Sequence, residues 1–271
     1  MKIGCCVNMV AADDAKIGID RVETLAALGY DYVELPIAQM MSLDDQAFER
    51  LAVRVEKSGI KCEAANNFFS AAQRITGSQP ICQKDMEAYI KKALSRAFRL
   101  GVKSIVFGSS GAKNVPENFD HSKAWAQIVQ LLRVVDDLIG CEDIHIAIEP
   151  LNSAESNIVK LTSEGLALAK DVARPSIRLL VDFYHFSMEN ENLAVIGEAA
   201  GYLQHMHIAN PAGRVWPKSS DAANYGAFFQ SLKTAGYNGR ISVEAYSDNF
   251  EDDAREALRT LRSAVESAWQ R

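Results

Sequence analysis

Short apolar runs alternate with amphipathic segments along the whole chain. The runs are rich in β-branched residues, as buried strands are, whereas the intervening segments repeat their apolar positions with the period of a helix. The runs predict eight strands, which cover residues 3–8, 32–35, 61–66, 104–108, 144–149, 177–182, 203–208 and 240–245.

Start and stop signals support helices between these strands. Ser42, in "SLDDQAFERL", is the predicted N-cap of one helix, with acids in its first turn. Gly29, Gly59, Gly101 and Gly140 each follow a helical segment and precede a strand, as C-terminal glycines do. The clearest helical segments are 20–28, 44–58, 84–99, 120–139, 162–173 and 252–269.

The order of these elements predicts the fold class. Strands that alternate with helices pair in parallel through right-handed crossovers. Eight such units favour an α/β fold closed into a (β/α)8 TIM barrel over an open sheet. The chain has 271 residues, and neither a linker nor a shift in composition divides it. Residues 1–271 are therefore expected to form a single barrel domain.

Composition narrows the class of protein. The chain is 48% hydrophobic and 24% charged, which is typical of a folded globular protein. A net charge of −6 disfavours nucleic acid as a partner, and no apolar run approaches the roughly 20 residues of a membrane helix. The five cysteines are odd in number and contain no C-x-x-C pair. We expect reduced, mostly buried thiols in a cytoplasmic protein without a membrane or nucleic-acid partner.

The ends of the last four predicted strands carry the candidate chemistry. Strands five and six end in Glu149 and Asp182, strand seven ends near His207, and strand eight contains Glu244 close to its end. In a TIM barrel these ends share one mouth. Each acid alone suits a helix cap or an ion pair, and a lone histidine suits a hydrogen-bonded core position. Three acids in register would repel one another without a cation, so we predict one divalent metal ion, with Mn²⁺ preferred and Mg²⁺, Co²⁺ or Zn²⁺ also suited to these ligands.

Four segments containing these residues resemble a known family. "IAIEPLN", "LLVDFYH", "HMHIANPAGR" and "ISVEAY" are similar to motifs of the sugar-phosphate isomerase/epimerase superfamily of xylose-isomerase-like barrels. The nearest likeness is to ketose 3-epimerases of the D-tagatose/D-psicose type and to hydroxypyruvate isomerase. The histidine at position 207 favours the epimerase side.

The resemblance implies a role for each matching position. Glu149, Asp182, His207 and Glu244 correspond to the metal ligands. Glu149 and Glu244 would also be catalytic, exchanging a proton with a sugar through a metal-stabilised cis-enediolate. The substrate would be a ketose or a small hydroxy-carbonyl compound, and relatives are often homodimers or homotetramers. The substrate-binding positions would be Glu155, His185 and Arg214.

Other residues near the predicted mouth carry less specific signals. Phe69 and Trp216 are candidates for an apolar wall of the pocket, and Glu34, at the end of strand two, is a further candidate for its lining. The loop after His207 is about one residue longer before its arginine than in the epimerases. Because that loop contributes to substrate selection, the sugar stays open.

Three other functions remain as alternatives at this point. A metal-dependent dehydratase of the inosose or dehydroshikimate type would use the same ligands to eliminate water. An apurinic endonuclease would need further histidines at strands three and four, where Asn66 and Gly108 stand. A non-catalytic sugar-binding barrel would not need the complete ligand set.

Overall fold

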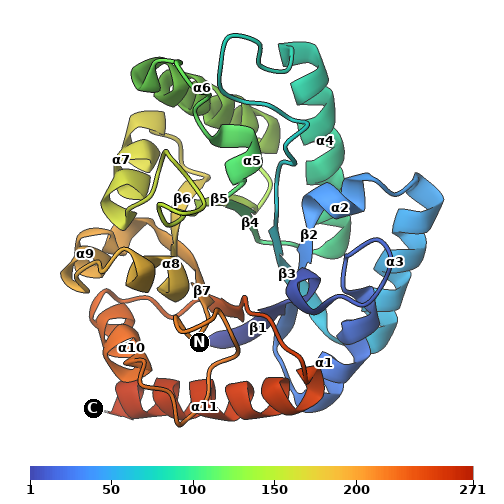
Figure 1. Cartoon of the computed structure of the whole chain (residues 1–271). Coiled ribbons are helices and arrows are strands. Elements are labelled where there is room, and N and C mark those ends of the chain that lie inside the picture. The colour runs from blue at the N-terminus through green and yellow to red at the C-terminus, as the bar shows by residue number, and fades with distance from the viewer. Residues whose placement is uncertain (271) are drawn as a thin grey trace.

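The predicted barrel is confirmed by the computed structural model, which describes residues 1–270. Eight parallel strands close in chain order, with β1 paired to both β2 and β8. Figure 1 shows the strands at the centre and the larger helices in a ring around them. The strands are β1 Lys2–Cys6, β2 Tyr32–Pro36, β3 Lys61–Asn66, β4 Ser104–Phe107, β5 His145–Ile148, β6 Ile177–Asp182, β7 Leu203–Ile208 and β8 Arg240–Val243.

Long helices lie outside the barrel, and several short ones follow the strand ends. Short 3-10 segments are η1 Val7–Val10, η2 Ile19–Arg21 and η3 Ala200–Tyr202. The α-helices are α1 Val22–Leu28, α2 Ile37–Met41, α3 Asp45–Ser58, α4 Gln83–Leu100, α5 Ser110–Lys113, α6 His121–Ile139, α7 Thr162–Val172, α8 Phe183–Met188, α9 Ala194–Glu198, α10 Tyr225–Thr234 and α11 Phe250–Gln270.

The predicted helix 44–58 is confirmed as α3, but its predicted capping residue was wrong. The cap of α3 is Asp44, whose carboxylate accepts a hydrogen bond from the Ala47 amide at 2.6 Å. Ser42 instead closes the preceding short helix, because its hydroxyl donates to the Gln39 carbonyl at 2.6 Å. The short helix α2 lacks a recognisable pattern in the sequence, so the serine was assigned to the wrong helix.

Strand length and register determine where the candidate residues lie. Strands β5 and β8 end one residue before Glu149 and Glu244, so both acids begin the loops at the mouth. Asp182 is the last residue of β6 and lies in register with His207, which is in register with Ser242 of β8. The parallel register therefore brings the ends of four neighbouring strands to similar heights.

The state of the cysteines and the character of the helices can be compared with the expectations from composition. All five cysteines are free thiols; Cys5, Cys6 and Cys62 are buried, whereas Cys82 and Cys141 are exposed. None of the helices within residues 1–270 combines the length and the apolar character needed to cross a membrane.

Candidate metal and active site

The side chains at the ends of β5 to β8 converge. Ligand atoms of Glu149, Asp182, Glu244 and His185 all lie within 4.8 Å of one another, and all four residues are buried. His207 joins the same group, because its Nδ1 lies 2.9 Å from Glu149 Oε1 and 3.5 Å from Glu244 Oε2. The fold thus brings together the four residues predicted as ligands, and their role in metal binding stays a prediction.

The electrostatics of the group are those of acids crowded in a dry site. Burial raises the pKa of Asp182 to about 7, although the nearby Arg214 guanidinium opposes the shift. Burial also raises the pKa of Glu149. Burial acts in the same sense on Glu244, but the charges of His207 and Arg214 outweigh it and hold the pKa of Glu244 at about 2. Without a cation these carboxylates compete for protons, as closely spaced acids do.

Two buried polar atoms in this group lack a hydrogen-bond partner among residues 1–270. They are Asp182 Oδ2 and His185 Nε2, which lie 3.5 Å from each other. An unpaired buried polar atom is costly, so such atoms in a native site indicate a missing ligand. The carboxylate oxygens of Glu149, Asp182 and Glu244, with Nδ1 of His207, suit a divalent ion such as Mn²⁺. The residues present therefore fit the predicted metal.

His185 is oriented as a hydrogen-bond donor. Its Nδ1 accepts from the Asn152 backbone amide at 3.2 Å and faces the Asn152 side-chain nitrogen at 2.8 Å. Burial lowers the pKa of His185 to about 3, so the ring is neutral and carries its proton on Nε2. That N–H points at the acid cluster, which suits a contact with substrate oxygen better than ligation of the metal.

Arg214 lies between the acids and the cavity. Its guanidinium bonds to Glu244 Oε2 at 2.5 Å and to Glu155 Oε1 at 3.2 Å, and lies 4.8 Å from the centre of the Tyr184 ring. Its Nε is buried without a hydrogen-bond partner within residues 1–270. The predicted substrate residues Glu155 and Arg214 are therefore in contact, with donors left over for a ligand.

A cavity of about 620 Å³ opens above the cluster. Glu149, Glu155, Arg214 and Glu244 line it, together with Phe69, one of the two aromatic residues predicted for its wall. Trp216 does not line this cavity. It is 1% exposed, and its ring packs edge-on against those of Tyr30 and Phe250. A tryptophan next to a mouth loop thus belongs to the core, as most large aromatics do.

Gly108, directly after β4, was not recognised as a site residue. A Cβ atom built on Gly108 would lie 2.3 Å from Glu149 Oε2. The lack of a side chain therefore gives the Glu149 carboxylate its position. In the sequence this glycine is part of "GSSG", which resembles any flexible loop.

Gly108→Ala is expected to lower kcat/KM by about 100-fold, since displacing a reacting group by about 1 Å has an effect of that size. The free energy of unfolding should change little, because the closest atom to the new methyl group is the end of the flexible Glu149 side chain, and Leu151 Cδ2 lies at an ordinary contact distance of 3.6 Å. Gly197→Ala in α9 is the matched control, since nothing lies within 4 Å of its Cβ position. Equal activity in the two variants would contradict this account of Glu149.

Lys113, at the end of α5, was also missed. Its ammonium is fully buried and donates to the Gly108 carbonyl, which holds the turn beside Glu149. Burial lowers the pKa of Lys113 to about 8, while Glu149 and Glu155 act in the opposite sense. A lysine in a glycine-rich loop is typical of a solvated surface, so no sequence pattern indicates that Lys113 is buried.

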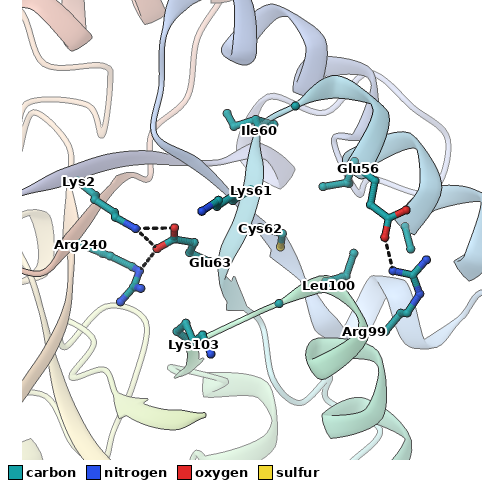
Figure 2. Close-up of a pocket in the computed structure, with 14 residues that line it drawn as sticks. Lys2, Glu56, Ile60, Lys61, Cys62, Glu63, Arg99, Leu100, Lys103 and Arg240 are labelled. Atoms are coloured by element: carbon teal, nitrogen blue, oxygen red, sulfur yellow. Dashed lines mark hydrogen bonds and ion pairs between the residues drawn. The ribbon is translucent and has the colours of Figure 1, made fainter. Parts of the chain in front are cut away.

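A second cavity, of about 520 Å³, lies at the opposite end of the barrel. Figure 2 shows Lys2 and Arg240 converging there on Glu63. The Lys2 ammonium lies 2.6 Å from Glu63 Oε1, and Arg240 Nε lies 2.6 Å from Glu63 Oε2. These residues begin β1 and β8 or lie in β3, at the face of a TIM barrel that serves stability.

Glu63→Gln is expected to reduce the free energy of unfolding by about 1–3 kcal/mol, since two cations lose their charged partner. Catalytic activity should stay unchanged, because Glu63 lies at the end of the barrel away from the acid cluster. Urea denaturation and steady-state kinetics on the same preparation measure both quantities. A large loss of kcat in a folded variant would show that the two ends are coupled.

Comparison with known proteins places the chain in a family. A family model described as a xylose isomerase-like TIM barrel matches residues 22–264. The chain belongs to this family. The predicted resemblance is therefore confirmed.

Relatives of this xylose isomerase-like barrel include epimerases and isomerases. An L-ribulose 3-epimerase from Methylomonas sp. is 27% identical over 232 residues, covering 84% of this chain and 78% of that protein. Hydroxypyruvate isomerase from Escherichia coli is 26% identical over 179 residues, covering 65% and 68%. The crystal structure of a D-allulose 3-epimerase from Methylomonas sp. in complex with D-allulose has a TM-score of 0.86 at 22% identity, with 97% of each chain covered. That structural likeness shows the fold.

Proposed function

We propose that this chain is a divalent-metal-dependent isomerase that epimerises an uncharged ketose by moving a proton next to the carbonyl. The observation that carries the proposal is the placement of Glu149 and Glu244. They come from β5 and β8, and each lies within 3.5 Å of the same nitrogen of His207. The curated relatives, which include an L-ribulose 3-epimerase, support the same reaction class.

The two glutamates divide the proton transfer between them. One carboxylate removes the proton from the carbon beside the carbonyl, and the other returns a proton to the opposite face. A divalent ion held by Glu149, Asp182, His207 and Glu244 would polarise the carbonyl and stabilise negative charge on its oxygen. The same carboxylate pair also suits aldose–ketose isomerisation, in which the proton returns to the neighbouring carbon.

Three further residues orient the sugar. The Nε2–H of His185 and the free guanidinium hydrogens of Arg214 donate to substrate hydroxyl or carbonyl oxygens. Glu155 accepts from Arg214 Nη1 at 3.2 Å and so fixes the guanidinium. Holding the reacting carbon between the two glutamates in this way supplies much of the rate enhancement.

The charge of the cavity favours an unphosphorylated substrate. Among the cavity-lining residues, all within 1–270, Arg214 is the one cation, and it is paired with Glu155 and Glu244. A phosphate group would need several charge-assisted donors, whereas this lining offers one guanidinium that is already paired with two carboxylates. Lys218 is engaged instead by Asp253, 3.0 Å away.

Solvent deuterium exchange tests the proposal. Purified protein with Mn²⁺ in D₂O is incubated with free ketoses, with ketose phosphates and with hydroxypyruvate, and the products are analysed by NMR. Deuterium uptake with inversion at one carbon of a free ketose is expected. Loss of water would identify a dehydratase, conversion of hydroxypyruvate would identify the corresponding isomerase, and the absence of exchange with every compound would overturn the proposal.

A further inference from the structure

A second polar cluster lies inside the barrel, below the candidate metal site. Its members, all fully buried, are Tyr32, Glu34, His205, His207 and Ser242. They come from β2, β7 and β8. Within β2 and within β7 the two members are two positions apart, which places them on the same face of the strand, and β8 contributes Ser242 alone. Glu34 is at the centre of this cluster.

Glu34 accepts hydrogen bonds on both carboxylate oxygens. Its Oε1 lies 3.0 Å from His207 Nε2, and its Oε2 lies 2.7 Å from His205 Nε2. The Ser242 hydroxyl donates to Oε2 at 2.6 Å and lies 2.8 Å from the Tyr32 hydroxyl. Three donors therefore hold a carboxylate that solvent does not reach.

A fully buried carboxylate is a costly way to stabilise a barrel. Apolar side chains of similar volume often replace such ionic groups without loss of stability. A neighbouring group of side chains is apolar instead: Val106, Ala147 and Leu180 form a separate buried cluster, and Leu180 lies in register with His205. The cost of Glu34 indicates a task that an apolar residue cannot perform.

The geometry of His207 identifies that task. His207 reaches Glu34 through Nε2 and reaches Glu149 and Glu244 through Nδ1. When the Nε2 hydrogen is donated to Glu34, the Nδ1 lone pair is free for a cation and points at the predicted ligands. A carboxylate that binds the outer nitrogen of a metal-ligating histidine fixes its tautomer and ring orientation and strengthens the ligand.

We propose that Glu34 is a positioning residue that holds His207 with Nδ1 directed into the metal site. This inference rests on the proposed function, because it assigns Glu34 a role toward the same ion. His205, Ser242 and Tyr32 fix the Glu34 carboxylate in turn.

A second metal ion in the lower cluster is the competing explanation. Cys6, Glu34 and His207 have ligand atoms within 4.8 Å of one another, with Cys6 Sγ 3.7 Å from His207 Nε2. The hydrogen bonds of Glu34 argue against an ion there. Both of its carboxylate oxygens already accept from protein donors, and Nε2 of His207 is one of those donors.

Calorimetric titration with Mn²⁺ tests the role of Glu34. In Glu34→Gln the side-chain amide matches the carboxylate in shape, but its nitrogen cannot accept a hydrogen bond. It can therefore no longer accept from both His205 and His207. We expect one Mn²⁺ per wild-type chain and a dissociation constant about 10–100-fold larger in the variant, the usual effect of losing such a partner. Glu63→Gln is the matched control, since it also removes a buried carboxylate but should leave the dissociation constant unchanged.

The outcomes separate the possibilities. Wild-type affinity in folded Glu34→Gln, verified by circular dichroism, would overturn the inference, as would two ions in the wild type with one lost on Glu34→Gln or Cys6→Ser. If Glu34→Gln does not fold, Glu34→Asp keeps the charge but withdraws the carboxylate from Nε2, and about a tenfold loss of affinity is expected. Mn²⁺ binding without turnover of any ketose would refute the proposed function and leave the role of Glu34 standing. A wild type that binds no divalent ion would overturn both.

Discussion

Glu149→Gln and Glu244→Gln are each expected to lower kcat at least about 1,000-fold while leaving the barrel folded. Each variant keeps an oxygen toward the predicted metal but loses the ability to take up or release a proton. General acid–base catalysis contributes about 10²–10⁴-fold, and here the lost group is also a predicted metal ligand. Steady-state kinetics on the substrate found by deuterium exchange, with circular dichroism on the same samples, measures both effects.

The double variant sharpens the test of the two glutamates. Residues that act as a unit show non-additive losses, so Glu149→Gln with Glu244→Gln should be little slower than either single variant. Glu155→Gln is the control acid, because Glu155 contacts Arg214 rather than the ligand cluster, and it should mainly raise KM. Near-normal kcat in either folded single variant would refute the assignment of these residues as acid and base.

Asp182→Asn is expected to have opposite effects on metal binding and on the stability of the metal-free protein. Loss of this predicted anionic ligand should weaken Mn²⁺ binding by at least about 100-fold, because removing even a residue that only hydrogen-bonds to a metal ligand costs about 10–100-fold. In the metal-free protein at pH 8, however, the variant should be the more stable one. The reason is that Asp182 must be ionised there in a buried group of acids, whereas asparagine carries no charge.

The sign of this effect follows from the pKa of Asp182. Its value is raised from 3.8 to about 7 in the folded chain, so the folded state holds this proton more tightly than the unfolded state. The stability that the protonated carboxyl contributes is complete below about pH 4 and is lost as pH rises to about 7. The Tm of the metal-free wild type should therefore fall over this window, with a smaller fall in Asp182→Asn.

Thermal unfolding with and without Mn²⁺ measures both predictions for Asp182. Without metal at pH 8, Asp182→Asn should melt about 2–4 °C higher, the shift that 1 kcal/mol produces in a chain of this size. With excess Mn²⁺ the wild type should gain stability by mass action and the variant much less. Asn157→Ala changes the neighbouring loop outside the cluster. Its melting temperature should not change from above to below that of the wild type when Mn²⁺ is added. A wild type that melts above Asp182→Asn under both conditions would contradict the predicted strain among the acids.

Much of this architecture was predictable because its determinants are local. Apolar runs of strand length, helical periodicity and closing glycines recur within a few tens of residues, and eight repeats of that unit define a closed barrel. Glu149, Asp182 and Glu244 were found in the same way, because an acid directly after an apolar run marks the end of a strand. The error at Ser42 had a local cause too, since α2 is too short to leave a periodic pattern.

The depth and direction of each side chain were decided by the tertiary structure. Glu34 and Asp182 both occur at strand ends in the sequence, yet Glu34 lies beneath His207 and Asp182 lies beside it. The register between strands shifts at Val33/Glu34 and again at Leu179/Leu180, and no pattern within one strand reports its offset from the next. Long-range packing likewise buried Trp216 away from the cavity and enclosed Lys113 behind the Glu149 loop. The sequence by itself determined where the strands end, because those signals are local. Closure of the barrel decided which side chains reach the mouth and which of them meet, because that depends on register between strands far apart in the chain.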